Sequence, residues 1–425
     1  MNQPAGEPWS LYSGSRRWVY LGVIFLVTLS AYADRNIVAI ILEPIKAEFH
    51  VSDAMLGLLT GGAFAIFYAT LGMPIARWAD RGDRRVVLAL SIAVWSLMTM
   101  LCGLSQTFWQ LAAARIGVGA GEAGAAPPAQ SLLVDYFPPT QRARAFGVYL
   151  TASTAAVLLT MTLGGQVVQA FGWRALLLIA GAPGLVLALL ARVILKEPRC
   201  ILGVARSVRG EALFPALRVL LRKRSYRNIL VGFILYCLIA YGVMVFLVSF
   251  IVRAHGFSVA KAGLVVGLVT GAGSLLGNIV GGVLTDRLAA RDVGRLTLIP
   301  GWGLTAACPV MLGVFATPAV PWMLSLLFVG FFMILAVAPA FYAALHAVCG
   351  SARRATAVAV AVFCANVIGF TLGPLITGAL SDWFSRSMGP AHGLRLSLLI
   401  MMTLFVPSGF FLLRATKSLR VELEA

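Results

Sequence analysis

Residues 76–85 read Ala-Arg-Trp-Ala-Asp-Arg-Gly-Asp-Arg-Arg, and residues 282–291 read Gly-Val-Leu-Thr-Asp-Arg-Leu-Ala-Ala-Arg. In both stretches a small residue precedes an Asp-Arg pair by four positions, and further arginine follows the pair. Each stretch also comes directly after the second apolar run in its half of the chain. Because one polar sequence recurs at the same point of two apolar blocks, we predict two similar halves, an arrangement typical of secondary transporters.

The apolar composition places the chain in a membrane. Of its 425 residues, 60% are hydrophobic and 12% are charged, and the mean hydropathy is +0.90. A soluble domain is about 45–50% apolar and about 25% charged. Runs of about 20 apolar residues, long enough to cross a bilayer as helices, recur along the chain. The sequence therefore predicts an all-α membrane protein with twelve transmembrane helices, at residues 18–41, 54–76, 86–105, 108–133, 145–169, 174–195, 228–252, 261–284, 296–315, 321–346, 355–379 and 394–414.

The longest polar stretch, residues 196–227, lies between the sixth and seventh of these spans. We therefore expect a six-helix bundle at 1–195, a cytoplasmic linker at 196–227 and a second six-helix bundle at 228–425. Within the linker, four apolar residues fall on one helical face among arginines: Phe214, Leu217, Leu220 and Leu221. This pattern fits an amphipathic helix on the anionic inner leaflet, or a solvated linker that touches no lipid.

The net charge of +18 would indicate nucleic-acid binding in a soluble protein, but its distribution indicates a membrane topology. When the loops are assigned alternately to two sides, 26 of the 34 lysines and arginines fall on the side of the N-terminus and 6 on the other. By the positive-inside rule, both termini are then cytoplasmic, as an even number of spans also requires. We expect a monomeric, multi-pass protein of the cell inner membrane. Its expected partners are membrane lipids and a small amphipathic substrate, and no nucleic acid.

The run Asp80-Arg81-Gly82-Asp83-Arg84-Arg85 resembles the signature loop between helices 2 and 3 of the major facilitator superfamily. Ala76 and Asp83 depart from that pattern, since glycine is usual at both positions. The resemblance implies the major facilitator fold and a cytoplasmic gate, in which Asp80 faces the N-terminal end of span 355–379 and Arg84 bridges to Asp135. The predicted gate residues, with the equivalent loop of the second half, are Asp80, Arg81, Arg84, Arg85, Asp135, Asp286 and Arg287.

Four ionisable residues lie well inside predicted spans, away from their ends: Asp34 and Arg35 in the first, Arg115 and Glu122 in the fourth. Charged groups are costly in hydrocarbon, so they usually face a cavity, pair with each other and mark a transport pathway. Counted along the helices at about 1.5 Å per residue, Asp34 and Arg115 lie at similar depths from the outer ends of their spans. This count predicts an Asp34–Arg115 pair. Arg35 then reaches the deeper Glu122 only through its side-chain length or a shifted register.

We expect Asp34 and Glu122 to carry protons, and Arg35 and Arg115 to be their charge partners. Burial disfavours the charged form of a carboxyl group, whereas a nearby arginine favours it, so movement of the helices can change its protonation. An anionic substrate that binds one of the arginines has the same effect. The alternative is a buried ion network that only locks the first span to the fourth.

Two segments resemble the spinster-type transporters of this superfamily. They are Tyr32-Ala-Asp34-Arg35-Asn36 in the first span, and residues 115–138, which begin with Arg115 and contain Glu122-Ala-Gly-Ala-Ala-Pro-Pro-Ala-Gln-Ser. The resemblance implies alternating access, proton coupling and a lipid-like amphipathic anion as substrate, with Tyr32 and Asn36 beside the charges. Organic-anion and sugar-acid symporters of the superfamily carry similar charges, so a small organic anion stays open as the alternative substrate.

The spans of the second half contain no carboxylate, and they are rich in Phe, Leu and Val. Their scattered polar side chains are Tyr236, Tyr241, Asn278, Tyr342, His346 and Asn366. A surface of this composition suits an acyl chain better than a sugar acid, although helix faces toward lipid have a similar composition.

The sequence lacks the motifs of other classes of protein. Residues 119–124 match G-x-G-x-x-G, but no strand precedes them and Asp135 comes too early for a dinucleotide site, so we expect a helix-packing surface. The four histidines are isolated, and HExxH and GxSxG are absent, so we expect no enzyme. The six cysteines form no CxxC motif, so we expect neither a disulfide nor a metal site. No filter sequence indicates a channel. We expect no cofactor, with protons as the coupling ion.

Overall fold

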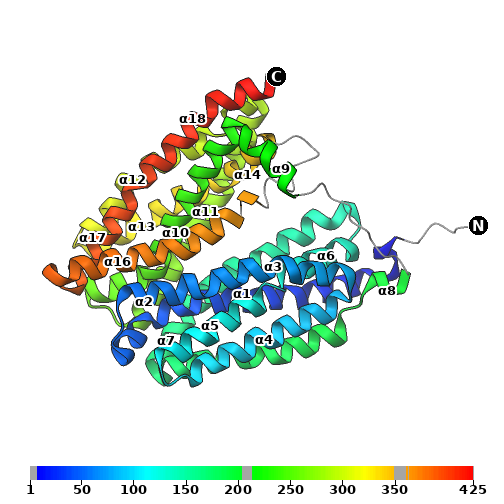
Figure 1. Ribbon diagram of the computed structural model, residues 1–425, viewed down its shortest axis with the longest axis horizontal. Coiled ribbons are helices and arrows are strands. Elements are labelled where there is room, and N and C mark those ends of the chain that lie inside the picture. Colours follow the sequence, from blue (N-terminus) through cyan, green and yellow to red (C-terminus); the bar gives the residue numbers. More distant parts are fainter. Residues whose placement is uncertain (1–6, 203–212, 349–359, 362, 425) are drawn as a thin grey trace, which may run out of the picture. The chain divides into compact units, whose positions relative to one another are not determined.

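The computed structural model describes residues 7–202, 213–348, 360–361 and 363–424, and every element in these ranges is a helix. The contacts divide the chain into two compact units (Figure 1). Unit 1 consists of Met1–His50 and Ala63–Arg209, and unit 2 of Val51–Gly62 and Gly210–Ala425. The main boundary therefore falls inside the predicted linker, while a short piece of the first half belongs to unit 2.

Ten helices of the described ranges are long and apolar enough to cross a membrane. The predicted span 108–133 is not among them, because it is divided between two shorter helices. Pro127 and Pro128 stand at the break, where a proline cannot donate a helical hydrogen bond. In contrast, residues 139–194 form one continuous 56-residue element that contains two predicted spans, separated at Gly172 (φ 82°). The fold thus has about ten to twelve apolar helices.

The helices of unit 1 pack around α1 and α4, which both contact the longest helix, α7. Trp95, Leu88 and Ile92 on α4 are completely buried in this core. A Cβ atom at Gly119 would lie 2.5 Å from the Phe64 carbonyl oxygen, and one at Gly121 would lie 2.6 Å from the Trp95 backbone nitrogen. These close approaches confirm that the glycines of residues 119–124 form a packing surface. The elements of unit 1 are η1 (Pro8–Leu11), α1 (Gly14–Phe49), α3 (Ala63–Arg81), α4 (Arg84–Leu104), α5 (Phe108–Glu122), α6 (Ala126–Tyr136), α7 (Pro139–Ile194) and α8 (Pro198–Leu202).

Unit 2 is organised around α10, which contacts α16 and α18, while α11 packs along α13. Gly273, Gly277 and Gly281 lie where α11 meets α13. A Cβ atom at Gly281 would come within 2.0 Å of the Ala336 carbonyl oxygen. The elements of unit 2 are α2 (Asp53–Gly57), η2 (Leu58–Gly62), α9 (Leu213–Arg222), α10 (Arg224–His255), α11 (Val259–Arg291), η3 (Val293–Arg295), α12 (Leu298–Ala316), α13 (Val320–Ala336), α14 (Ala338–Val348), η4 (Ala365–Phe370), α16 (Thr371–Met388), α17 (Pro390–Thr403) and α18 (Phe405–Glu424).

The predicted linker contains a helix, α9, which covers the four apolar residues expected on its apolar face. Leu220 is buried against unit 2, whereas Leu221 is 39% exposed. Beyond its end, Lys223 donates a hydrogen bond from Nζ to the Val348 carbonyl oxygen (2.7 Å). Residues 203–212 of the linker lie outside the described ranges. The binding of α9 to lipid stays a prediction.

Candidate functional site

The four charges predicted inside the membrane meet between α1 and α5 of unit 1. Arg35 donates a hydrogen bond from Nε to Glu122 Oε2 across 2.6 Å. Glu122 is completely buried, and the Arg35 side chain is 22% exposed. The ion pair that forms among the four residues is therefore Arg35–Glu122, which the depth count had made secondary. The count measured positions along the helix axes and gave too little weight to the length of the arginine side chain.

The predicted Asp34–Arg115 ion pair is wrong for this structure. Asp34, 2% exposed, accepts a hydrogen bond at Oδ2 from Thr99 Oγ1 of α4 (2.7 Å). Its Oδ1 atom and the Nε and Nη1 atoms of buried Arg115 have no hydrogen-bond partner in the described ranges. The guanidinium of Arg115 lies over the Phe64 ring instead, 5.5 Å from the ring centroid. Asp34 and Arg115 thus bury polar atoms without hydrogen-bond partners, which is costly and is uncommon in proteins.

Aromatic rings hold the guanidinium of Arg35 in place. Its Cζ lies 4.6 Å from the Tyr68 ring centroid, 5.2 Å from that of Tyr32 and 5.3 Å from that of Phe64. Such cation–π contacts attract the guanidinium without neutralising its charge. The predicted residue Asn36 takes no part in this arrangement, because its amide donates to the Tyr32 carbonyl oxygen of the same helix (2.6 Å).

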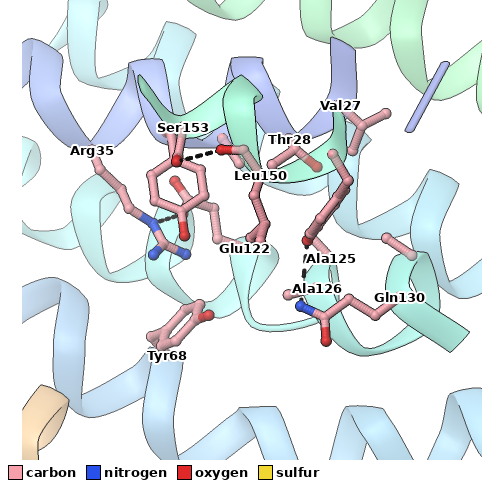
Figure 2. A pocket seen from close by; sticks show the side chains of 14 residues that line it. Val27, Thr28, Arg35, Tyr68, Glu122, Ala125, Ala126, Gln130, Leu150 and Ser153 are labelled. Carbon is pink, nitrogen blue, oxygen red and sulfur yellow. Dashed lines mark hydrogen bonds and ion pairs between the residues drawn. The ribbon is translucent and has the colours of Figure 1, made fainter. Parts of the chain in front are cut away.

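Arg35 and Glu122 line a cavity of about 90 Å³ (Figure 2). Besides this pair, its polar wall contains Thr28, Gln130, Tyr149 and Ser153. Gln130 Nε2 donates to the Tyr149 hydroxyl (3.5 Å), and the close-up shows both Gln130 and Ser153 on the cavity wall. Thr28, Tyr149 and Ser153 were not predicted, because a single sequence does not show which neutral polar residues of an apolar helix face a cavity. Gln130 lies in the stretch that carried the spinster resemblance.

A second charged network surrounds Arg84, which is completely buried at the start of α4. The predicted contact with Asp135 is present (Nη1 to Oδ2, 2.7 Å). Arg84 also donates from Nε to Glu197 Oε2 (2.9 Å) and from its backbone N–H to the same oxygen (3.0 Å). The side chain of Glu197 is fully buried, and this residue was not among the predicted gate residues. The available signal was a carboxylate directly after span 174–195, in a stretch that is otherwise mostly basic.

The other predicted gate residues are more exposed than Arg84 and make fewer contacts. Arg85 pairs with Asp83 (Nη2 to Oδ2, 2.6 Å), which caps α4. Burial raises the pKa of Asp83, but the hydrogen bonds from Arg85 outweigh it, so the net pKa is lowered from its usual value. Arg81, Asp286 and Arg287 are exposed, and no ion pair of theirs occurs in the described part of the chain. Asp80 Oδ1 lies 4.0 Å from Arg199 Nη1. The predicted partner of Asp80, the N-terminal end of span 355–379, lies outside the described residues.

Unit 2 contains a separate, apolar cavity of about 230 Å³. Its wall includes Tyr236, Tyr241, Met244, Met311, Phe331 and Phe405. The Tyr236 hydroxyl donates to the Ile334 carbonyl oxygen (3.4 Å), so the ring presents its apolar part. Of the other polar residues predicted for this half, Asn278, Tyr342 and His346 are exposed and do not line the cavity. The side chain of Asn366 lies outside the described part.

Comparison with known proteins places this geometry among transporters. A family model described as the Major Facilitator Superfamily matches residues 24–367 and 229–424. An "MFS-type efflux pump" of Mycolicibacterium smegmatis is 33% identical over 91% of this chain and 89% of that protein. A "Probable L-galactonate transporter" of Escherichia coli K12 is 24% identical over 89% of this chain and 84% of that protein.

Among solved structures, the chain is similar to a bacterial homologue of the human lysosomal transporter Spinster, in an inward-facing and unoccupied conformation. The TM-score is 0.88 and the identity 29%, over 97% of this chain and 99% of that one. The predicted resemblance to the major facilitator superfamily and its spinster-type members is confirmed.

Proposed function

The chain belongs to the major facilitator superfamily, and from that membership we propose that it is a proton-coupled secondary transporter of an amphipathic, lipid-like anion. It works by alternating access, with twelve spans and both termini in the cytoplasm of a cell whose inner membrane it crosses. The observation that carries the proposal is the Arg35–Glu122 pair. A buried carboxyl group that is paired with an arginine at the edge of a cavity is costly, and such a pair is typical of a transport pathway.

Proton and substrate are coupled through Arg35. While Glu122 accepts a hydrogen bond from Arg35, its charge is balanced. An anion that enters the cavity competes for the same guanidinium. A buried carboxylate without its cationic partner is stabilised by binding a proton, so substrate binding and proton binding favour each other. Asp34 and Arg115, both buried with free hydrogen-bonding atoms, supply a second carboxylate and a second cation within the same unit.

The apolar cavity of unit 2 supports a substrate with a hydrocarbon part. Its wall of methionine, phenylalanine and tyrosine side chains suits an acyl chain, which gains about 0.8 kcal/mol for each buried CH₂ group. The charged cavity of unit 1 suits an anionic head group. The chain is also similar to a bacterial Spinster homologue, at 29% identity over nearly the whole chain, and it was the resemblance to spinster-type transporters that led us to expect this substrate class.

A small organic anion such as a sugar acid is the second candidate. The cavity of unit 1 is small and has several neutral hydrogen-bonding groups, among them Gln130, Tyr149 and Ser153, which suit the hydroxyl groups of such a substrate. The relative named for L-galactonate supports this candidate.

Thermal unfolding of the purified protein distinguishes the two. A ligand that binds only the folded state stabilises it, by about 2.7 kcal/mol at a hundredfold excess over its Kd. We expect stabilisation by lysophospholipids and by long-chain alkyl phosphates, and none by hexonates at equal concentration. Stabilisation by hexonates alone would establish the second candidate, and stabilisation by both would indicate a broad anion specificity.

A further inference from the structure

Two contacts between an arginine and a tryptophan lie at one end of unit 1, where α1 and α7 begin. The Cζ atom of Arg144 on α7 lies 5.1 Å from the ring centroid of Trp18 on α1. The Cζ atom of Arg142 lies 5.3 Å from the ring centroid of Trp9, which belongs to η1. Phe137 meets the Trp18 ring edge-to-face, with 5.5 Å between the centroids. Such contacts hold the guanidinium groups beside the rings without neutralising their charge.

The two arginines of α7 differ in their hydrogen bonds. Arg142 donates from Nε to the Val134 and Phe137 carbonyl oxygens at the end of α6 (3.2 and 3.1 Å). Arg144 is exposed, and it makes no hydrogen bond or ion pair with a described residue. A guanidinium carries five N–H donors in a planar fork that matches the oxygens of a phosphate group. Arg144 therefore presents an anion-binding group beside an aromatic ring.

The chain around these contacts is basic. Residues 8–20 and 137–148, which contain both tryptophans and both arginines, include four arginines in all and no carboxylate. The nearest acidic residues along the chain are Glu7, which is exposed, and Asp135, which pairs with Arg84 (2.7 Å). Near an anionic membrane surface, each Lys or Arg contributes about 1 kcal/mol of attraction. The local excess of positive charge thus favours an anionic partner.

The cluster lies where the sequence places the edge of the membrane. Predicted spans begin at residues 18 and 145, so Trp18 and Arg144 stand at the starts of two spans. By the topology expected from the sequence, both starts are on the cytoplasmic side. Tryptophan is enriched at this depth, and basic pockets between helices on the cytoplasmic side bind the head groups of anionic lipids.

From this cluster onward, α1 and α7 run side by side in the same direction. Thr28 of α1 and Tyr149 of α7 line the same cavity. Farther along both helices, a Cβ atom at Gly164 would lie 2.9 Å from Ile40 Cδ1. Residues that follow the cluster on α1 are therefore neighbours of residues that follow it on α7.

One turn beyond the cluster, each of the two helices has an exposed glycine. On α1, Gly22 follows Trp18 by four residues, and on α7, Gly147 follows Arg144 by three. These spacings place each glycine on the same helix face as the cluster residue before it. A Cβ atom built at either glycine would meet no atom within 4 Å. Exposed apolar side chains flank the glycines: Val19 and Leu26 on α1 and Val148 on α7. An exposed apolar strip with open space thus leads from the cluster into the predicted spans.

We propose that this corner of unit 1 binds an anionic diacyl phospholipid of the inner leaflet. The phosphate of the lipid accepts hydrogen bonds from Arg144 beside the Trp18 ring, and its acyl chains lie along the strip at Gly22 and Gly147. None of these four residues lines the charged cavity of unit 1, so the phospholipid site is separate from the proposed substrate site. The bound lipid joins the starts of α1 and α7 and stabilises the fold, and it is not transported.

Thermal unfolding of the full-length protein in detergent tests this site. The added lipids are dioleoyl phosphatidylglycerol, which is anionic, and dioleoyl phosphatidylcholine, which has the same acyl chains and no net charge. We expect phosphatidylglycerol to raise the unfolding midpoint by about 3 °C or more, and phosphatidylcholine to raise it by less than half as much. Inorganic phosphate at the same concentration should have no effect, because it has no acyl chain to bury.

Substitutions locate the effect on the structure. Arg144→Gln removes the charge that binds the phosphate, and Gly147→Leu fills the space for the acyl chains. Each variant should lose more than half of the rise with phosphatidylglycerol, measured against its own midpoint without lipid. The matched controls are Arg291→Gln, at an exposed arginine of α11 expected on the same side of the membrane, and Gly72→Leu, at a glycine of α3 where a Cβ atom would meet no atom within 4 Å. Both controls should keep the full rise.

Three results would overturn the phospholipid site. The first is a full rise in either folded variant, Arg144→Gln or Gly147→Leu, and the second is an equal rise with the two phospholipids. The third is an equal rise with inorganic phosphate, which would make the cluster a binding site for a free anion. If Gly147→Leu does not fold, Gly22→Leu replaces it in the same comparison.

Discussion

Arg35 and Glu122 form an ion pair at 2.6 Å whose carboxylate is completely buried and whose guanidinium is partly exposed to a cavity. The two partners therefore differ in their access to the cavity. Both residues border the cavity, but the guanidinium of Arg35 is the more accessible of the two charged groups. The aromatic rings of Tyr32, Phe64 and Tyr68 contact the guanidinium independently of the carboxylate.

The first prediction concerns proton coupling. Glu122→Gln and Asp34→Asn preserve the shape of the side chains but cannot bind and release a proton. We expect both variants to fold, and we expect transport to lose its acceleration by an imposed pH gradient. Proteoliposomes subjected to a pH jump measure this effect, with Glu48→Gln as a control, since Glu48 lies in an exposed pair with Arg174. Full gradient-driven transport by the double variant Asp34→Asn, Glu122→Gln would contradict proton coupling by these residues.

The second prediction separates a transport role of the Arg35–Glu122 pair from a structural one. Arg35→Ala leaves Glu122 buried without its partner, which should cost about 3–5 kcal/mol of stability. In the double variant Arg35→Leu, Glu122→Leu no charge is left behind, so we expect thermal stability to recover. Transport should stay absent in both. If the double variant regains transport together with its stability, the pair only joins α1 to α5.

Much of this site could be predicted from the sequence, because charges inside apolar spans are visible without a structure. Asp34, Arg35, Arg115 and Glu122 do lie on α1 and α5 of one unit. Their pairing could not be predicted, since depth along a helix says nothing about helix rotation or the position of a long side chain. The hydrogen bond from Thr99 to Asp34 could not be predicted either, because it also depends on how the helices are rotated.

The division into two units could also be predicted from the sequence, but the assignment of Val51–Gly62 to unit 2 could not. Hydropathy identifies the span that starts near residue 54 as one membrane-crossing segment. It does not reveal which neighbours each part of that segment contacts, so the docking of Val51–Gly62 on unit 2 escaped prediction. Asp53 precedes the predicted span 54–76 and was given no role in the sequence analysis, and the structure brings Arg253 and Ser381 to it.

The third prediction concerns Glu197. Glu197→Ala removes the carboxylate that receives the Arg84 side chain and leaves Asp135 as the remaining acidic partner in contact with Arg84. We expect a loss of about 3 kcal/mol or more, because the guanidinium of Arg84 is completely buried. Asp80→Ala should change stability by no more than about 0.5 kcal/mol, since that side chain is 59% exposed. Thermal unfolding in detergent measures both changes in stability. Equal losses of stability in the two variants would contradict a larger contribution of Glu197.

The fourth prediction tests the expected topology. Single cysteines near residue 210 and near residue 256, in a cysteine-free background, should react from opposite sides of the membrane. The reason is that 26 of the 34 basic residues lie on the side assigned to the linker. Labelling of intact cells and of inverted vesicles with an impermeant reagent measures the accessible side of each position. Reaction of both positions from outside would contradict cytoplasmic termini.

The fifth prediction connects the apolar cavity of unit 2 to the substrate. Ala240 of α10 borders this cavity, and Ala240→Phe would fill part of its volume of about 230 Å³. If an acyl chain occupies the cavity, the variant should lose most of the thermal stabilisation by a long-chain lysophospholipid, because fewer CH₂ groups can be buried. Stabilisation by a short-chain analogue should change little. Ala290→Phe on an exposed face of α11 is the matched control. Equal stabilisation of Ala240→Phe and the unchanged protein by the long-chain ligand would exclude this cavity as its binding site. The hydrocarbon part of the substrate would then have to bind elsewhere.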